Sequence, residues 1–308
     1  MADKWITVLG SFVADLAFRT KKIPEWGETV LGSGFAVGPG GKGSNQAVAA
    51  RRLGHNVSFI SKLGHDSFGD LARRMYEREG IDAQYVFETD DYPTGGAAII
   101  IDEALGQNAI VVVPGACYEV TPAEIDVASA RIADSAVLLT QLELRIPSVE
   151  HGLRLARYLG VVTMLNPAPA GVLPEDIFSL CDYLTPNESE AAGLTGVSVT
   201  NIAQADAAAA ALLARGARNV VLTLGNHGAL VKNAKLTEHV PAVNAGTVVD
   251  TTGAGDAFNG GFAVALAEGK DIVDATRFAC AVAGISVTRH GTAPSMPMRT
   301  EVDSLLRR

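Results

Sequence analysis

A group of glycines, hydroxyl residues and carboxylates in the last quarter of the chain has the spacing of an anion site. The segment Asp250-Thr-Thr-Gly-Ala-Gly-Asp256 precedes an apolar periodic run that predicts a helix over residues 256–267. Gly253 and Gly255 permit a tight turn, which gathers backbone N–H groups at the N-terminus of that helix, where the macrodipole also favours negative charge. A transferring phosphoryl group requires such donors. The short run Val248-Val249 predicts a strand leading into the turn.

Asp256 follows these glycines directly, so its carboxylate is expected beside the anion site. A carboxylate in that place can accept the proton of an attacking hydroxyl. The competing interpretation is that Asp256 only caps the helix, because Asp is favoured at helix N-termini. Local sequence leaves both interpretations open.

A second glycine-rich segment, residues 38–43, matches the pattern G-x-G-x-x-G. The dinucleotide-binding fingerprint belongs in the turn after the first strand, but here that strand is expected to end near Gly10, about thirty residues earlier. The phosphate-binding P-loop pattern also fails, since Ala36 and Gly43 stand where Gly and Ser or Thr are required. A glycine loop with Lys42 and Asn45 remains, and it suits close approach to a polyhydroxy ligand.

Oxygen ligands for a cation are suggested by Asp250 together with the later run Arg289-His-Gly-Thr-Ala-Pro-Ser295. Backbone carbonyls in Gly- and Pro-containing loops are good ligands for hard cations. This signal is weak when taken alone.

Short β-branched runs alternate with Ala-rich amphipathic runs along most of the chain. This alternation predicts a mostly parallel sheet with helices on both faces, and ligands bind outside the carboxyl ends of the strands in such folds. Strands are predicted over 6–9, 57–60, 137–140, 161–165, 183–185 and 220–223. Helices are predicted over 44–53, 68–79, 122–132, 149–159, 203–215, 256–267 and 272–287.

Two regions, approximately 12–38 and 94–113, lack helical periodicity. The second has the pattern of a hairpin whose turn contains Gly106. We expect the two regions to form a small separate β-sheet that acts as a lid on a single domain spanning residues 1–308. A plain surface elaboration is the alternative.

Composition limits the classes of function. Hydrophobic residues make up 48 % of the chain, which is enough for a globular core, and the net charge of -9 argues against non-specific binding to nucleic acid or to a membrane. Three scattered cysteines (Cys117, Cys181 and Cys280) and no recognisable leader or membrane-spanning run favour a cytoplasmic protein.

Four motifs in order carry a resemblance to a known family. They are Gly40-Gly-Lys-Gly-Ser-Asn-Gln-Ala47, Asn166-Pro-Ala-Pro169, Thr185-Pro-Asn-Glu-Ser-Glu190 and Asp250 through Asp256. Together they resemble the ribokinase family of sugar kinases over nearly the whole chain. The resemblance implies a ribokinase-like three-layer α/β/α domain with a mostly parallel central sheet plus a small β-sheet lid. It also implies MgATP as the phosphoryl donor, activation by a monovalent cation such as K⁺, and a homodimer formed through the lid.

The resemblance carries site residues over position by position. Asp256 matches the catalytic base, and the anion hole matches Gly253, Ala254 and Gly255. Sugar-contact positions match Asp15, Gly41, Lys42, Gly43, Asn45 and Glu143. Nucleotide-side positions match Asn187, Thr223, Gly225, Gly228 and Gly255, and Glu190 completes an Asn-x-x-Glu motif linked to magnesium and phosphate. The monovalent-cation loop matches Asp250, Thr252, Ser286, Arg289, Gly291 and Ser295.

One position departs from the family pattern. After the first strand the family has Gly-Ser-x-Asn-x-Asp, whereas this chain has Val13 in place of the asparagine. A buried sugar hydroxyl facing valine would lose a hydrogen-bond partner, at a cost of about 1–3 kcal/mol. That loss favours 2-deoxyribose or another sugar, whereas compensation by water or by a neighbouring residue would leave D-ribose as the substrate. The resemblance keeps D-ribose as the first expected substrate, phosphorylated at its terminal 5-hydroxyl to ribose 5-phosphate. A non-catalytic sugar sensor and a nicotinamide-dependent oxidoreductase are alternatives of other classes.

Overall fold

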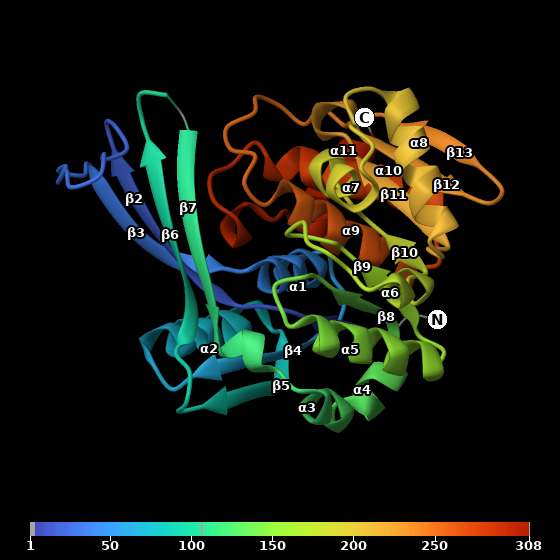
Figure 1. Ribbon diagram of the computed structural model, residues 1–308, viewed down its shortest axis with the longest axis horizontal. Helices are drawn as coiled ribbons and strands as arrows, with labels where there is room; N and C mark the ends of the chain where they lie inside the picture. Colours follow the sequence, from blue (N-terminus) through green and yellow to red (C-terminus); the bar gives the residue numbers. More distant parts are fainter. Residues whose placement is uncertain (1–3, 106, 308) are drawn as a thin grey trace.

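The computed structural model describes residues 4–105 and 107–307, and Gly106, expected in the hairpin turn, lies outside the described residues. Within these residues the larger sheet has nine strands in the order β13-β12-β11-β10-β9-β8-β1-β4-β5 (Figure 1). In chain order they are β1 (Trp5–Leu9), β4 (Val57–Gly64), β5 (Asp82–Thr89), β8 (Ser135–Thr140), β9 (Val162–Leu165), β10 (Tyr183–Leu184), β11 (Asn219–Thr223), β12 (Ala229–Asn233) and β13 (Thr237–Val240). Neighbours from β5 to β11 are parallel, and β12 and β13 extend that edge antiparallel.

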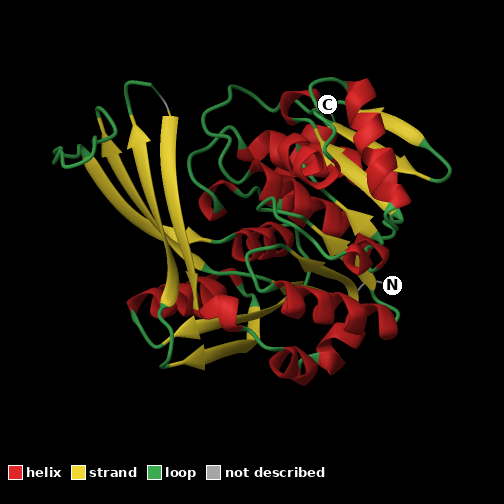
Figure 2. Cartoon of the chain, viewed as in Figure 1, coloured by secondary structure: helices red, strands yellow, loops and turns green. Residues whose placement is uncertain are grey.

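Helices cover both faces of this sheet (Figure 2). The α-helices are α1 (Lys42–Arg52), α2 (Ser67–Glu79), α3 (Pro122–Val127), α4 (Ser129–Ala133), α5 (Ile146–Tyr158), α6 (Glu175–Ser179), α7 (Glu188–Thr195), α8 (Ile202–Ala214), α9 (Ala254–Ala267), α10 (Ile272–Ser286) and α11 (Arg299–Leu306). The 3-10 helices are η1 (Ala116–Glu119), η2 (Gly225–His227) and η3 (Ala293–Ser295).

Two hydrophobic cores lie on opposite faces of the sheet. Val8 of β1 packs with Phe262 of α9 in one core, whereas the next residue, Leu9, packs with Leu153 of α5 in the other. Successive side chains of a strand point to opposite faces, so one strand serves both cores. The predicted three-layer α/β/α arrangement is confirmed.

The predicted elements are found, with two corrections. The predicted helix over 122–132 is two helices, because the N–H of Ala128 bonds the carbonyl of Ile125 at 3.0 Å and tightens the chain between α3 and α4. The predicted strand at Val248-Val249 is wrong: both residues lie in a loop, and the N–H of Val249 bonds the carbonyl of Val287 at 2.8 Å instead of joining a sheet. Among the described residues, no helix combines the length and the apolar character needed to cross a membrane.

A second sheet of four strands stands beside the main body (Figure 1), as the two non-helical regions predict. Its order is β3-β2-β6-β7, with β2 spanning Val13–Thr20, β3 Gly34–Gly40, β6 Thr94–Asp102 and β7 Gln107–Gly115. The two central strands pair in parallel, from Val13 opposite Gly95 onward, and each outer strand pairs antiparallel.

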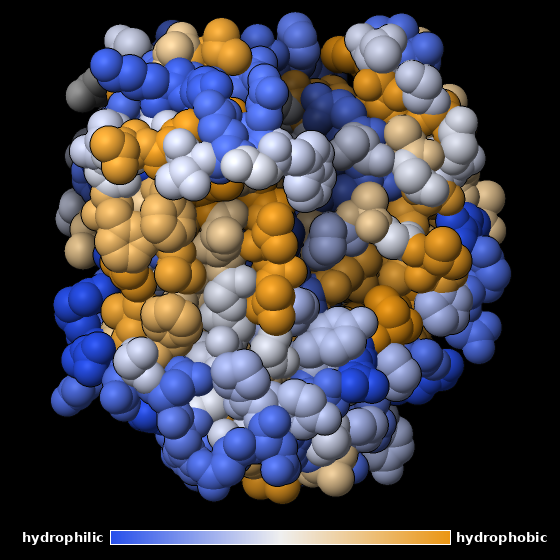
Figure 3. Space-filling model, turned by 60° about the vertical axis from the view of Figure 1, so that its left-hand side comes forward, coloured by the Kyte–Doolittle hydropathy of each residue, from blue (hydrophilic) through white to orange (hydrophobic). Residues whose placement is uncertain are grey.

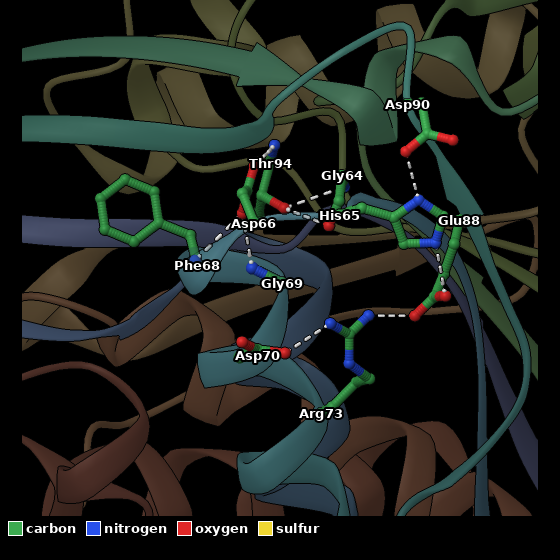
Figure 4. A network of polar contacts seen from close by, with 10 residues as sticks. All are labelled: Gly64, His65, Asp66, Phe68, Gly69, Asp70, Arg73, Glu88, Asp90 and Thr94. Carbon is green, nitrogen blue, oxygen red and sulfur yellow. Dashed lines mark hydrogen bonds and ion pairs between the residues drawn. The ribbon is translucent and has the colours of Figure 1, made fainter.

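The base of this small sheet is tied to the main body by the segment before α2 (Figure 4). Asp66 caps α2 by accepting the N–H groups of Phe68 at 3.0 Å and Gly69 at 2.8 Å, and it accepts the N–H of Thr94 at 2.7 Å. Thr94 begins β6, and its hydroxyl accepts the N–H of Gly64 at 2.9 Å. One carboxylate therefore joins a helix N-terminus to the first residue of a small-sheet strand.

His65 lies next to this joint, between two carboxylates (Figure 4). Its Nδ1 is 2.7 Å from Asp90 and its Nε2 is 2.9 Å from Glu88. Both ring nitrogens must donate to fill these contacts, which requires the imidazolium form. The hydrogen bonds to Asp90 and Glu88 accordingly raise the pKa of His65.

We predict that His65→Gln lowers Tm at acidic pH and that the difference from wild type shrinks as pH rises. Because folding raises the pKa of His65, its protonation stabilises the folded state. This stabilisation is fully present below the pKa of the unfolded state, about 6.5, and is lost as pH rises through the pKa of the folded state. Thermal denaturation between about pH 5 and pH 9 measures the difference. Asp90→Asn, which leaves Glu88 in place, should give an intermediate gap, and a gap independent of pH would contradict the prediction.

Candidate active site

The start of α9 presents open backbone donors. Gly253 takes the left-handed conformation (φ 80°) before the helix, and the N–H of Ala254 bonds the carbonyl of Thr251 at 3.2 Å. Among the described hydrogen bonds, none uses the N–H of Gly255 or of Asp256. These two donors and the helix dipole make a place for an anion.

Asp256 is buried at this helix start, with 7 % of its surface exposed. Its Oδ2 accepts the Asn45 amide N–H at 2.9 Å and its Oδ1 accepts the Gln46 amide N–H at 3.0 Å, both from α1. The carboxylate therefore faces another helix and does not cap its own, so the capping interpretation is wrong. Burial raises the pKa of Asp256, and the charge of Lys42 and the two amide hydrogen bonds oppose that rise.

A cavity of about 170 Å³ opens beside Asp256, at the carboxyl ends of the parallel strands. Seven residues of the predicted site line it, namely Lys42, Asn187, Glu190, Thr223, Gly253, Gly255 and Asp256. Four further residues line it: Asn166, Ala168 and Thr185, which belong to two of the family motifs, and Asn259, which belongs to none of them. Strand ends, α1 and α9 thus bring the anion donors and the carboxylate to one place.

Lys42 and Glu143 form a charged group at one side of this cavity. Glu143 accepts the backbone N–H of Lys42 at 2.9 Å and also the hydroxyl of Ser11. Burial alone would lower the pKa of Lys42, but the negative charges of Asp256, Glu143 and Glu190 outweigh it and raise that pKa. The three carboxylates therefore favour the charged form of Lys42.

The glycine loop before α1 lies too close to β1 for side chains. A Cβ on Gly43 would lie 2.6 Å from the Cα of Gly10. Gly41 has φ 89°, and a Cβ there would lie 2.9 Å from the carbonyl oxygen of Ser11. This close approach places Lys42 and Asn45 over the carboxyl end of β1, which explains the glycines better than a nucleotide loop does.

Asp15 and Val13 extend from β2 on the same face of the small sheet, since they are two residues apart. Asp15 accepts a hydrogen bond from the hydroxyl of Thr292 at 3.4 Å, which by itself would lower the pKa of Asp15. Burial, together with the charges of Glu143 and Asp256, outweighs this bond and raises that pKa to about 6. Asn45 adds a buried acceptor, because its Oδ1 has no partner among the described residues. These groups are suited to bind the hydroxyls of a polar ligand.

Glu190 and Asn187 are locked together at the start of α7. The Asn187 backbone and amide N–H groups donate to the two Glu190 oxygens at 2.9 and 3.0 Å, and the Asn187 side chain accepts the N–H of Glu190 at 2.8 Å. Burial raises the pKa of Glu190. Thr223 pairs with Asn187 across an isolated β-bridge. Gly225 and Gly228 form the turn that follows, with φ of 53° and 92°, and neither of these two glycines lines the cavity.

The predicted cation loop is assembled from two separate segments. Asp250 accepts the N–H of Thr252 at 2.9 Å and that of Gly291 at 3.0 Å, and these bonds lower its pKa although burial opposes them. In the second segment the Ser295 hydroxyl donates to the carbonyl of Thr292 at 2.8 Å. The backbone N–H of Arg289 donates to the carbonyl of Ser286 at 3.1 Å, and the Arg289 side chain forms an ion pair with Glu301. Within residues 4–105 and 107–307 there is no cluster of three or more His, Cys, Asp or Glu side chains able to hold a metal.

The fold and this site define a phosphotransferase that acts on a small hydroxyl compound. Residues 3–299 match the pfkB family of carbohydrate kinases, and the chain belongs to that family. A ribokinase of Haemophilus influenzae is 40 % identical over 298 residues, covering 97 % of each chain. A deoxyribokinase of Salmonella typhimurium is 38 % identical over 295 residues, covering 95 % of each. The solved structure of an Arabidopsis thaliana ribokinase complexed with ribose and ATP is similar with a TM-score of 0.92, at 30 % identity and with 100 % of each chain covered.

We predict that Gly255→Ala spares stability and damages nucleotide use. A Cβ at Gly255 would meet no atom within 4 Å, so the change should leave the free energy of unfolding unaltered or raise it by up to about 1 kcal/mol. The methyl group would project into the anion site, and kcat/KM for ATP should fall at least about tenfold.

Gly261→Ala on the same helix is the matched control. Its Cβ would lie 2.8 Å from Cγ2 of Val282 on α10, so it should destabilise the fold by about 1–3 kcal/mol. Steady-state kinetics and urea unfolding separate the two effects. Normal kcat/KM for ATP in Gly255→Ala would show that the anion does not bind there.

Proposed function

We propose that this carbohydrate kinase transfers the γ-phosphate of ATP to the terminal 5-hydroxyl of a pentose, with D-ribose giving ribose 5-phosphate as the first candidate. The supporting observation is the Asp256 carboxylate, buried between two amides of α1 beside the open N–H groups of α9. The relatives named as ribokinases, one of them solved with ribose and ATP, support the choice of sugar.

In the proposed reaction the sugar hydroxyls are oriented by four side chains, those of Asp15, Lys42, Asn45 and Glu143. Asp256 takes the proton as the terminal oxygen forms its bond to the γ-phosphorus and the bond to the β-phosphate oxygen breaks, releasing ADP. The N–H groups at Gly255 and Asp256 stabilise charge on the transferring oxygens.

Residues at the nucleotide side fit the cations that the family resemblance implies. Magnesium, which is bound in proteins by one or two carboxylates plus phosphate oxygens and water, would take Glu190 as its protein partner and would neutralise phosphate charge. A potassium-like ion would be held mainly by backbone oxygens of the 250–252 and 286–295 segments, which Asp250 joins by accepting the N–H groups of Thr252 and Gly291.

We also propose that the small sheet is a lid that excludes water and pairs two copies of the chain. One face of it carries large exposed apolar side chains from three of its four strands, and Figure 3 shows apolar residues gathered on this side of the molecule. They include Phe18 at 43 %, Phe35 at 60 %, Val37 at 45 %, Val111 at 67 % and Val113 at 59 % exposure. An apolar patch of this kind on a sheet marks an interaction surface.

Sedimentation at micromolar concentration should show a dimer that Phe18→Glu combined with Val111→Glu converts to a monomer. Burying two carboxylates in an apolar interface removes the driving force for association. Val127→Glu, at an exposed apolar residue of α3, is the control and should leave the dimer intact. A wild-type protein that sediments as a monomer would contradict the proposal.

Asp256→Asn should abolish turnover and leave nucleotide affinity within several-fold, because the amide keeps the shape of the side chain and cannot take the proton. ADP release is measured with magnesium, with and without potassium, on ribose, 2-deoxyribose, fructose, other pentoses and adenosine. Because burial raises the pKa of Asp256, wild-type kcat should fall as pH drops through that pKa. Near-normal turnover by Asp256→Asn would remove this residue from the role of base.

Val13 determines which pentose is preferred in this proposal. Its side chain is buried at 2 % exposure, on the same face of β2 as Asp15. Val13→Asn restores a partner for a sugar hydroxyl, and we expect it to raise the kcat/KM ratio of ribose over 2-deoxyribose by roughly tenfold. Val127→Asn, at an exposed residue of α3, is the control, and an unchanged ratio in Val13→Asn would show that Val13 does not select the sugar.

A further inference from the structure

Gln46 of α1 occupies a fully buried position (0 % exposed) between the proposed base and the sheet. Its amide nitrogen donates to Asp256 Oδ1 at 3.0 Å and to Asn166 Oδ1 at 3.1 Å. Its amide oxygen accepts the side-chain N–H of Gln141 at 2.6 Å. A glutamine amide has two N–H donors and one carbonyl, so all of its polar groups are used and only one orientation fits.

The partners of Gln46 are themselves fixed. The Asn166 amide donates to the backbone carbonyl of Thr185 at 3.0 Å, which turns its oxygen toward Gln46. Gln141 is 1 % exposed and lies directly after β8. A chain of amides thus runs from the carboxyl ends of the strands to Asp256.

The same network reaches the anion site. The Thr185 hydroxyl donates to Asn259 Oδ1 at 2.6 Å, and the Asn259 amide donates to the carbonyl of Gly255 at 2.8 Å. The carboxylate and the peptide that carries an anion donor are therefore held by one connected set of side chains.

We propose that Gln46, supported by Gln141, is a positioning residue for phosphoryl transfer: it holds Asp256 in one rotamer and in its ionised form without touching either substrate. Each carboxylate oxygen has two lone-pair directions, and one amide N–H on each oxygen leaves the other direction for the sugar hydroxyl. A buried carboxylate without such donors favours its neutral form, which cannot act as a base. The inference rests on the proposed role of Asp256 as base.

The test is the pH dependence of kcat in Gln46→Met, which keeps the side-chain length and removes its hydrogen bonds. We expect kcat to fall about 10- to 100-fold through misplacement of Asp256. The acidic limb of the kcat profile should move upward by about one pH unit, while KM for ATP stays within several-fold. Gln46→Glu places a second carboxylate against Asp256 and should move the limb further in the same direction.

Thr7→Val is the matched control. Thr7, in the middle of β1, shares a buried hydroxyl hydrogen bond of 2.7 Å with Ser135, the first residue of β8, at the opposite end of β8 from the cavity. The change should lower Tm without moving the acidic limb. A limb that moves equally in Thr7→Val would show that general loosening of the sheet accounts for the effect.

Gln141→Met covers the case in which Gln46→Met does not fold. It leaves the Gln46 donors in place and removes the group that orients them, so it should shift the limb in the same direction by a smaller amount. The positioning role is overturned if the variant that folds has wild-type kcat and an unmoved acidic limb. If Asp256→Asn is inactive in the same experiments, the proposed function still stands. An active Asp256→Asn would instead remove the proposed function itself.

Discussion

The buried charge of Asp256 is the constraint on which the rest of the site depends. A carboxylate removed from water is costly unless hydrogen bonds and an opposite charge compensate it. Here two amides of α1, the ammonium of Lys42 and the positive end of α9 provide that compensation. None of these groups is near Asp256 in the sequence except those of α9, so the compensation depends on the fold as a whole.

Close contact between helices makes this arrangement possible. Gly260 of α9 meets Ala49 and Gln46 of α1 at distances that leave no room for a Cβ, and Gly43 meets Gly10, directly after β1, in the same way. Small residues therefore let α1 approach α9 and β1 closely enough for short amide side chains to span the gap. Gly41 and Gly43, which belong to the segment that resembles a nucleotide-binding fingerprint, serve close packing in this fold.

Local sequence predicts much of the architecture because the strands and helices of the central sheet have clear periodicity. The anion turn and Asp256 are also predictable, since glycine spacing and helix polarity are local properties. The roles of Gln46, Gln141 and Asn259 are not, because their partners lie far away in the chain. The sequence does hold one signal for Gln46, which is a polar residue followed directly by the apolar run from Ala47 to Ala50. The structure shows that this polar side chain is fully buried. The strand predicted at Val248-Val249 fails for a related reason, since β-branched residues also occur in loops that a distant carbonyl anchors.

The parallel pairing of β2 with β6 has a consequence for the order of folding. In the chain these strands are separated by β3, α1, β4, α2 and β5, and their pairing begins with Val13 opposite Gly95. A pairing between such distant segments pays its loop-closure entropy before contacts compensate it. The pairing of β1 with β8 is more distant still, with Ile6 opposite Val137, but both of these strands are buried between the two cores, whereas the small sheet leaves apolar side chains such as Phe35 and Val111 exposed. The small sheet is therefore expected to be a late cooperative unit of folding, with amide hydrogens that exchange sooner than those of β1 and β8.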